Sequence, residues 1–278
     1  MMKIDAHHHF WHYNTRDYGW ISDGMAVLRR DFLPADLKPE LERAGIDRVV
    51  SVQARQCVEE TEWLLGFAEE NDFIAGVVGW LPIASPEFPA LLEKFAANPK
   101  LRAIRHVVQD EPDDRFILGE AFNRGIDRLL SAHLAYDILI FERHLPFAVE
   151  FVRNHSPEQV FVLDHIAKPK IAAGEMQPWA DNLRKLAAFP NVFCKLSGLV
   201  TEADIRNWTP GQLRPYVETV LDAFGPARVM FGSDWPVCTC ATNYSAWRSL
   251  VGEFISHLSE HEQAQIMGGT ALKAYFGG

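Results

Sequence analysis

The sequence predicts one (β/α)8 TIM barrel that spans residues 1–278 as a single domain, and three observations support this. Eight short apolar or β-branched runs alternate with amphipathic helical stretches, which is typical of parallel strands. Eight such strands close a barrel, and 278 residues suit one domain of this kind. The alternative is an open doubly wound sheet, which would carry a glycine-rich phosphate turn after its first strand, where this chain has histidines.

The predicted strands follow one another in chain order. They cover residues 4–9, 48–53, 74–80, 101–108, 136–140, 159–164, 192–197 and 228–234. Proline near the start and glycine or proline after the end predict helices over residues 34–44, 88–97 and 210–224. A stripe of Trp63, Leu64 and Phe67 predicts one over 59–70. Residues 247–276 are expected to form two further helices that close the barrel wall.

The first connection, residues 10–33, is too long for a simple turn and is rich in aromatic residues, among them Trp11 and Trp20. A long aromatic loop at the mouth of a barrel forms a wall or lid over a ligand, or seals the rim, and one loop can do both. Exposed aromatic side chains in this loop would equally suit a homodimer.

Composition narrows the class of partner. A net charge of −10 argues against nucleic acid or an anionic membrane surface, while a local Arg/His cluster still permits a small anionic ligand. No apolar run approaches the roughly 20 residues needed to span a bilayer, and no signal peptide is recognised. The four cysteines are scattered and suit a reduced, cytoplasmic protein; Cys238 and Cys240 have no second pair to complete a metal clip.

The first strand ends in Asp5-Ala6-His7-His8-His9, and its side chains alternate faces with period two. His7 and His9 are therefore expected on one face and His8 on the other. Two imidazoles on one face can hold a metal ion or an anionic group. Asp5 shares the parity of His7, so we expect it one layer deeper, where it orients a histidine or fills the barrel floor.

Polar and ionisable residues end seven of the eight predicted strands, and in a barrel these ends converge on one space. The residues at or beside these ends are His7, His9, Gln53, Arg55, Trp80, Arg105, His106, Asp164, His165, Lys195, Ser197, Asp234 and Trp235. A purely structural barrel has little reason to gather so many charges at one end. The sequence therefore predicts a catalytic or binding site there.

Structural alternatives remain open for several of these residues. Asp234 can cap the turn before Pro236, and His165 can be a hydrogen-bonded rim histidine. Arg105 can pair with Asp164, and Lys195 can pair with Asp137 or Asp164. His106 neighbours Arg105 on the same strand, so alternation can turn it away from the pocket.

Four motifs then show a resemblance to a known family. DAHHHFW at residues 5–11, DHIAKP at 164–169, KLSGL at 195–199 and FGSDWPV at 231–237 resemble the amidohydrolase superfamily. More narrowly, they are similar to its amidohydrolase 2 branch and to the sugar-lactone hydrolases there, the L-fuconolactonases and L-rhamnonolactonases. The resemblance covers nearly the whole chain.

The resemblance implies a site. The family's first-strand histidines fall on His7 and His9, its sixth-strand histidine on His165 and its eighth-strand aspartate on Asp234. The family's fifth-strand histidine or carboxylated lysine has no counterpart, because that strand ends in apolar residues up to Phe141. The set suits one Zn²⁺ with an open position, and a metal-independent lactonase is equally compatible.

The implied reaction is hydrolysis of a sugar lactone to the sugar acid. Asp234 would act as general base on water, and zinc or Arg105, His106 or His165 would stabilise the oxyanion. The expected contacts to the sugar come from Trp11, Gln53, Arg55, Trp80, Lys195, Ser197 and Trp235. The alternatives are a decarboxylase of an aromatic or muconate-like acid and a non-catalytic carbohydrate-binding barrel.

Overall fold

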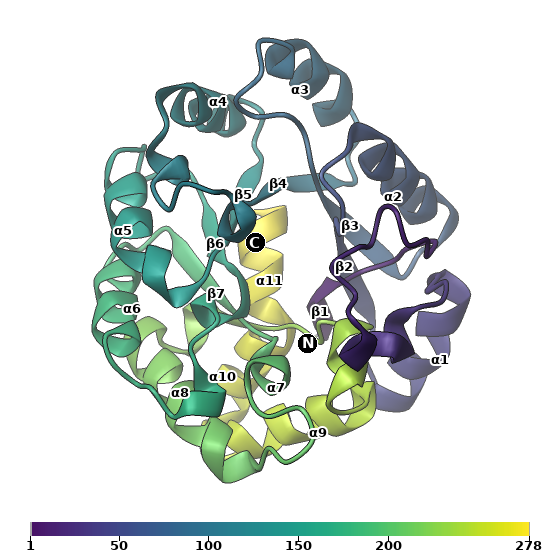
Figure 1. The fold of residues 1–278 in the computed structure, drawn as a ribbon, viewed down its shortest axis with the longest axis vertical. Coiled ribbons are helices and arrows are strands. Elements are labelled where there is room, and N and C mark those ends of the chain that lie inside the picture. Colours follow the sequence, from purple (N-terminus) through teal and green to yellow (C-terminus); the bar gives the residue numbers. More distant parts are fainter. Residues whose placement is uncertain (1, 278) are drawn as a thin grey trace.

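The computed structural model describes residues 2–277 and confirms the barrel (Figure 1). Eight parallel strands pair in chain order. They are β1 (Ile4–His8), β2 (Arg48–Val52), β3 (Ile74–Gly79), β4 (Leu101–Val107), β5 (Ala135–Leu139), β6 (Phe161–Leu163), β7 (Val192–Leu196) and β8 (Val229–Phe231). The backbone N–H of His9 donates to Trp235 O at 2.7 Å and that of Asp234 to His7 O at 2.8 Å, so the first strand closes on the last.

Helices surround the barrel on its outer face (Figure 1). They are α1 (Pro34–Ala44), α2 (Val58–Glu70), α3 (Phe88–Ala96), α4 (Glu120–Ser131), α5 (Leu145–Arg153), α6 (Trp179–Ala187), α7 (Leu199–Glu202), α8 (Pro210–Phe224), α9 (Tyr244–Phe254), α10 (Glu260–Ala264) and α11 (Thr270–Phe276). The signals read at the start of α8 are confirmed: the Thr209 N–H donates to the Gln212 side chain at 2.8 Å, in a capping box. No helix in the described part of the chain is long and apolar enough to cross a membrane.

Most predicted strands end one residue earlier in the structure, and the larger differences are in two places. β6 and β8 are shorter than predicted because the chain leaves the ladder at Asp164 and at Gly232 to build the rim of the pocket. The C-terminal segment forms three helices instead of two, with a π-helical turn over Gln265–Gly269. Gly268 in that turn lies so close to β1 that an added Cβ would be 2.0 Å from the Met2 carbonyl oxygen, so the helix breaks there.

The barrel interior is apolar at its amino-terminal end and is closed there by α11, which is visible through the barrel in Figure 1. Small and β-branched side chains such as Ala6, Val50 and Val162 fill the lower layers. Tyr275 of α11 passes beyond them, and its hydroxyl lies 2.8 Å from Asp137 Oδ2 inside the barrel. The C-terminal helix α11 thus donates a hydrogen bond to the buried Asp137 carboxylate from the amino-terminal end of the barrel.

The first connection packs most of its aromatic residues inward. Trp11, Tyr18 and Phe32 are buried, and the Trp11 indole donates to Arg30 O at 2.9 Å. Trp20 is 45% exposed and lines the pocket beside the barrel mouth. The loop therefore seals the rim with one part and forms a pocket wall with another.

Tyr275→Phe tests the support from α11. The substitution removes the buried hydroxyl that donates to Asp137, and we expect the free energy of unfolding to fall by about 1–3 kcal/mol. Tyr136→Phe is the matched control, because the Tyr136 hydroxyl is also buried and has no hydrogen-bond partner within residues 2–277. Urea unfolding of both variants measures the difference; equal losses would show that the Asp137 contact is not stabilising.

Candidate active site

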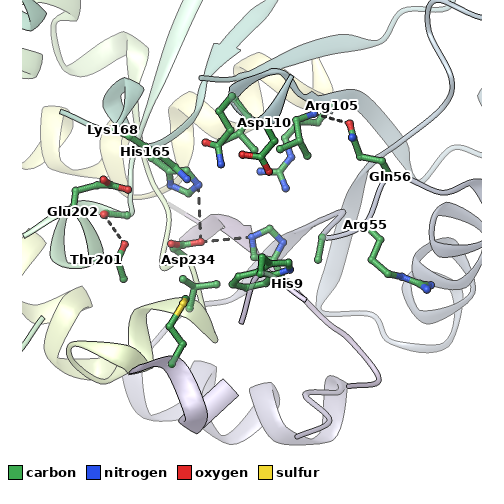
Figure 2. Close-up of a pocket in the computed structure, with 18 of the residues that line it drawn as sticks. His9, Arg55, Gln56, Arg105, Asp110, His165, Lys168, Thr201, Glu202 and Asp234 are labelled. Carbon is green, nitrogen blue, oxygen red and sulfur yellow. Dashed lines mark hydrogen bonds and ion pairs between the residues drawn. The ribbon is translucent and has the colours of Figure 1, made fainter. Parts of the chain in front are cut away.

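A pocket of about 660 Å³ opens at the carboxyl ends of the strands (Figure 2). His165, Lys168, Thr201, Glu202 and Asp234 lie on one side of it in this view, and Arg55, Gln56 and Arg105 on the other. Its other lining residues are His9, Asp17, Trp20, Met25, Ala54, Cys57, Val107, Gln109, Asp110, Leu139, Gly198 and Val237. The volume suits a small polar ligand such as a monosaccharide derivative.

A bulge in β1 aims its histidines. Asp5 pairs with Val49 but His8 pairs with Ser51, so β1 has one residue more than β2 over this span. His7 and His9 face the interior and His8 bonds the Ser51 hydroxyl at 2.9 Å on the outer side, as alternation predicted. Asp5 does not share the face of His7 as expected, because the bulge breaks the alternation and its carboxylate accepts from the Tyr244 hydroxyl of α9 at 2.8 Å. It still contacts a histidine, since Asp5 Oδ1 accepts from the His7 backbone N–H at 3.1 Å.

His7, His9 and Asp234 form a compact candidate metal site. The Nε2 atoms of His7 and His9 are 3.1 Å apart, and Asp234 Oδ1 lies 3.8 and 3.5 Å from them. Ligands of tetrahedral zinc at 2.0–2.1 Å are about 3.3 Å apart, so this triangle fits one such ion. His9 Nδ1 lies 2.8 Å from Val52 O, which directs the lone pair of Nε2 into the triangle.

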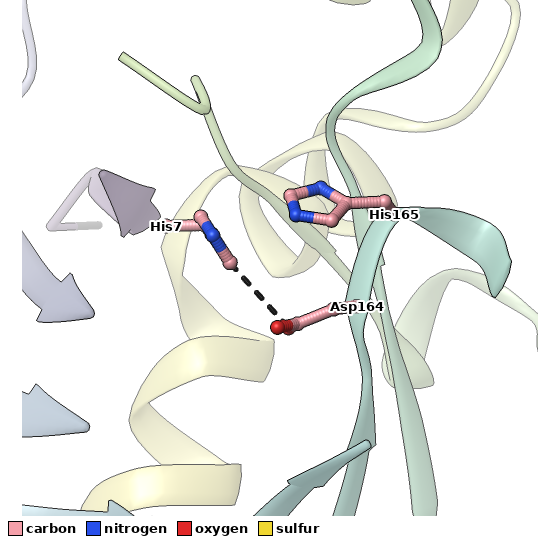
Figure 3. A group of neighbouring side chains, drawn as sticks. All are labelled: His7, Asp164 and His165. Atoms are coloured by element: carbon pink, nitrogen blue, oxygen red, sulfur yellow. Dashed lines mark ion pairs between the residues drawn. The ribbon is translucent and has the colours of Figure 1, made fainter. Parts of the chain in front are cut away.

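His7, Asp164 and His165 form a second group with metal-ligand spacing (Figure 3). Its carboxylate is already neutralised, since Asp164 Oδ2 accepts from Arg105 at 2.9 Å and Oδ1 lies 2.9 Å from Lys195 Nζ. A cation there would compete with two fixed protein cations. The donor set of His7, His9 and Asp234 therefore fits a metal ion, and this second group does not.

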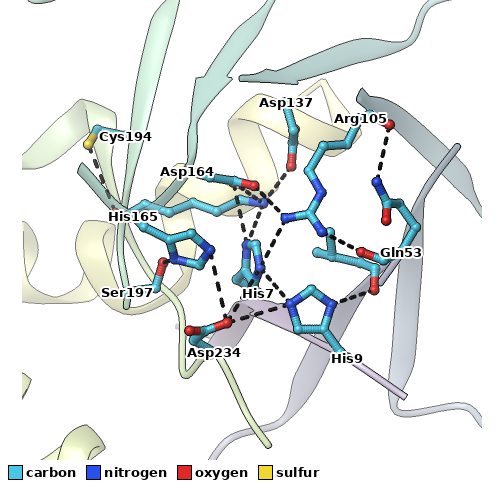
Figure 4. A network of polar contacts seen from close by, with 12 residues as sticks. His7, His9, Gln53, Arg105, Asp137, Asp164, His165, Cys194, Ser197 and Asp234 are labelled. Atoms are coloured by element: carbon cyan, nitrogen blue, oxygen red, sulfur yellow. Dashed lines mark hydrogen bonds and ion pairs between the residues drawn. The ribbon is translucent and has the colours of Figure 1, made fainter. Parts of the chain in front are cut away.

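A buried layer of charges lies directly under the histidines (Figure 4). Lys195 Nζ is 2.5 Å from Asp137 Oδ2 and 3.2 Å from His7 Nδ1, and Arg105 joins the same cluster through Asp164. Two cations and two carboxylates balance, which is the condition for keeping such groups out of water. The layer fixes His7 from below.

Burial and the neighbouring charges together set the protonation states of Asp164, Asp137 and His7. Burial by itself would raise the pKa of Asp164, but Lys195, His7 and Arg105 outweigh it and hold that pKa well below its ordinary range. Burial raises the pKa of Asp137 to about 6, with Lys195 opposing the shift. Burial also lowers the pKa of His7 well below 6.5, so His7 is neutral near pH 7.

Asp234 and His165 differ in charge although they are neighbours. Burial would raise the pKa of Asp234, but His165 and His9 more than offset it and the net shift is downward. Burial lowers the pKa of His165 to about 4. An ionised carboxylate thus lies beside the neutral imidazole of His165, with His165 Nε2 at 4.0 Å from Asp234 Oδ1 and His165 Nδ1 at 2.9 Å from the Ser197 hydroxyl.

The turn after β6 has an unusual backbone. His165, Ile166, Ala167 and Lys168 all have φ between 47° and 62°, which places four consecutive non-glycine residues in the left-handed region. Each such residue costs about 1–2 kcal/mol. Trp179 holds the turn by donating to Ile166 O at 2.7 Å, and Gly198 leaves room for His165, because an added Cβ would be 2.7 Å from its Nδ1.

Of the residues predicted at the site, the structure brings five to the pocket surface. These are His9, Arg55, Arg105, His165 and Asp234. His7 lies just beneath them, fully buried. The predicted cluster of histidines around Asp234 is therefore present.

The other predicted residues are not at the pocket surface. Lys195 is buried in the charge layer, Gln53 donates to Arg105 O at 3.3 Å and Ser197 supports His165. Trp11 and Trp235 belong to the aromatic core under the first loop. These side chains sit one layer below or outside the ligand space, so they position the groups that reach it.

His106 turns away from the pocket, which was the structural alternative for it. Its Nδ1 accepts from the Trp80 indole at 3.2 Å, and its Nε2 lies 2.6 Å from Glu111. Trp80 is thereby held against His106 instead of the cavity. Neither residue lines the pocket.

Sequence reasoning missed Lys168, Glu202, Asp17, Gln56 and Asp110, which all line the pocket. Lys168 had a signal, since it lies in the DHIAKP motif three residues after His165. The others lie on loops or short helices, where no period places a side chain. Tertiary packing alone brings these residues together around the pocket.

Comparison with known proteins agrees with this geometry. Residues 4–277 match the sequence profile of the amidohydrolases. The chain belongs to the amidohydrolase family. The L-fucono-1,5-lactonase of Burkholderia multivorans is 42% identical, over 99% of this chain and 96% of its own length. The L-fucono-1,5-lactonase of Burkholderia ambifaria is 41% identical, over 98% of this chain and 95% of its own.

A solved structure of an amidohydrolase from Burkholderia multivorans with bound zinc superimposes with a TM-score of 0.93 at 42% identity, covering 99% of both chains. A second crystal form of that amidohydrolase, with bound HEPES, gives a TM-score of 0.94. An amidohydrolase of this similarity therefore binds zinc, which agrees with the candidate metal site formed by His7, His9 and Asp234.

Gly198→Ala tests the packing of this amidohydrolase site. The substitution forces a left-handed residue at φ +73° and also drives a methyl group into His165. Gly174→Ala is the control, because Gly174 has φ +69° with nothing within 4 Å of the added Cβ. We expect both to lose about 1 kcal/mol of unfolding free energy and Gly198→Ala to lose a further 1–3 kcal/mol, about the cost of overpacking. Equal losses of unfolding free energy for the two variants in urea would show that His165 shifts to accept the methyl group without cost.

Proposed function

We propose that this protein hydrolyses a sugar lactone of the L-fucono-1,5-lactone class to the corresponding sugar acid. The observation that carries the proposal is the 42% identity to an L-fucono-1,5-lactonase over 99% of the chain. The pocket supports it, because its lining mixes carboxylates, cations and amides that can bind the hydroxyl groups of a sugar.

Asp234 is the proposed general base. Its Oδ1 takes the contacts to His7, His9 and His165, which leaves Oδ2 for a water molecule in the pocket. The lowered pKa keeps the carboxylate ionised near neutral pH, as a base must be. His7 and His165 are neutral near pH 7 because burial lowers the pKa of each, so they do not neutralise the charge of Asp234.

The proton balance needs no further acid. Water adds to the carbonyl carbon of the lactone and gives one proton to Asp234. When the bond between that carbon and the ring oxygen breaks, Asp234 returns the proton to the ring oxygen, which becomes a hydroxyl group. The carboxylic acid formed then loses its proton to solvent. Asp234 ends the cycle ionised.

The oxyanion formed on the carbonyl oxygen needs donors that are already in place. His165 supplies one in the tautomer whose Nδ1 accepts from the Ser197 hydroxyl 2.9 Å away, because its Nε2–H then donates into the pocket. Arg105 contributes fixed positive charge at the pocket floor, held by Asp164. Both groups are rigid, because their partners are buried.

His7, His9 and Asp234 are the residues that would hold one Zn²⁺. When bound, zinc supplies a Lewis acid that polarises a carbonyl and lowers the pKa of a coordinated water. A lactone is a reactive ester and His165 and Arg105 remain without metal, so we propose that zinc binds but is not essential for turnover.

The decarboxylase alternative gains no support from the site. It requires a fuller metal set with a ligand from the fifth strand, and β5 presents Leu139 to the pocket. The homodimer stays a prediction; Trp20 and Val27 of the first loop are exposed.

Asp234→Asn tests the general base. We expect kcat for L-fucono-1,5-lactone to fall about 100- to 10,000-fold, as for loss of a general base, with the unfolding midpoint little changed. Asp181→Asn is the control, since Asp181 is exposed and pairs with Arg184 outside the pocket, and we expect its kcat to match that of the wild type. A pH-indicator assay of ring opening measures both, and near-native turnover by Asp234→Asn would overturn the assignment.

His9→Asn tests the metal site. The wild type is expected to bind one zinc per chain in equilibrium dialysis, and His9→Asn to bind it at least about tenfold more weakly, because one of three ligands is lost. His12→Asn is the control, since His12 is exposed and pairs with Asp31.

Ring opening by the wild type should continue after treatment with a chelator. A complete loss of activity that zinc restores would show instead that the metal is required.

A further inference from the structure

The left-handed turn after β6 presents two side chains to the same pocket wall. The Lys168 N–H donates to His165 O at 2.8 Å, so the turn closes over three residues and brings positions 165 and 168 to the same side. Both side chains line the pocket (Figure 2). Strain of this kind persists where the surrounding structure enforces it, and it concentrates at functional positions.

Lys168 is the pocket cation whose charge is not already used. Arg105 is bound by Asp164 at 2.9 Å, and Arg55 by Asp17 at 2.7 Å. The Lys168 ammonium has no ion-pair partner within residues 2–277, and it lies 5.5 Å from the centre of the Phe141 ring. Its charge is therefore available to a ligand.

The proposed reaction forms a negatively charged product, which a cation in the pocket can stabilise. Ring opening turns a neutral lactone into a carboxylate beside Asp234 and Glu202, which line the same wall. Lys168 and Glu202 lie on the same side of the pocket, where no ion pair joins them within residues 2–277 (Figure 2). Arg105 lies on the other side of the pocket and is bound by Asp164, so without Lys168 the product would meet carboxylates and the neutral His165 at this wall.

Building on the lactone hydrolysis proposed above, we propose that Lys168 contacts the substrate and binds the carboxylate of the ring-opened acid and the oxyanion that precedes it. The contact is stronger in the charged transition state and product than in the neutral lactone, so it raises kcat as well as product affinity. The ligand class is an aldonate with its carboxylate at the β6 side of the pocket.

Lys168→Met and Lys168→Asn test the proposal, the second because asparagine tolerates a left-handed backbone. Lys170→Met is the matched control, since Lys170 is exposed and pairs with Glu142 and Glu175 away from the pocket. For each protein, kcat and KM are measured on L-fucono-1,5-lactone. Calorimetry measures the affinity for L-fuconate and for the uncharged alcohol L-fucitol.

We expect both Lys168 variants to lose about 10- to 100-fold in kcat and in L-fuconate affinity, the range of one charge-assisted hydrogen bond. Binding of L-fucitol should be unchanged, and Lys168→Arg should recover part of the loss. L-fuconate affinity within twofold of the wild type in both variants would overturn the proposal. If the wild type opens no lactone, the proposed function fails, while the comparison of L-fuconate with L-fucitol still decides the role of Lys168.

Discussion

The site depends on one buried carboxylate, Asp164, held between Arg105 and Lys195. Burying a single charge in a barrel is prohibitive, and a balanced set is tolerated only when every member has its partner. Asp137 completes the balance by pairing with Lys195. His7 rests on this layer, so ion pairs buried beneath the pocket set the position of the candidate metal site.

The two ends of the barrel are specialised differently and linked by this layer. The amino-terminal end is apolar and closed by α11, whose Tyr275 carries a hydroxyl up to Asp137. The carboxyl end is polar and open. The C-terminal helix α11 thus stabilises the charge layer beneath His7. It does so through the hydrogen bond from the Tyr275 hydroxyl to Asp137.

Above the layer, the side chains that face the ligand are held by strained or crowded backbone. Four left-handed residues fix His165 and Lys168, a bulge in β1 aims His7 and His9, and Gly198 leaves space that any Cβ would fill. Strained or crowded backbone of this kind costs stability. Interactions with neighbouring side chains, such as the hydrogen bond from Trp179 to Ile166 O, hold it in place. The result is a preorganised set of groups beside Asp234, which stabilisation of the oxyanion in the proposed reaction requires.

The sequence by itself determined the barrel, the order of its strands, and the meeting of His7, His9, His165 and Asp234, because periodicity and parallel strand ends are local properties that add up in one way. Only the tertiary structure decided which polar residues face the ligand. Lys195, Gln53 and Ser197 end strands as His9 does, yet lie buried one layer lower. A bulge reversed the parity of Asp5, and a left-handed turn brought in Lys168. The depth of a side chain in the barrel, the position of a bulge and the handedness of a turn all depend on packing between distant segments. No local sequence pattern encodes them.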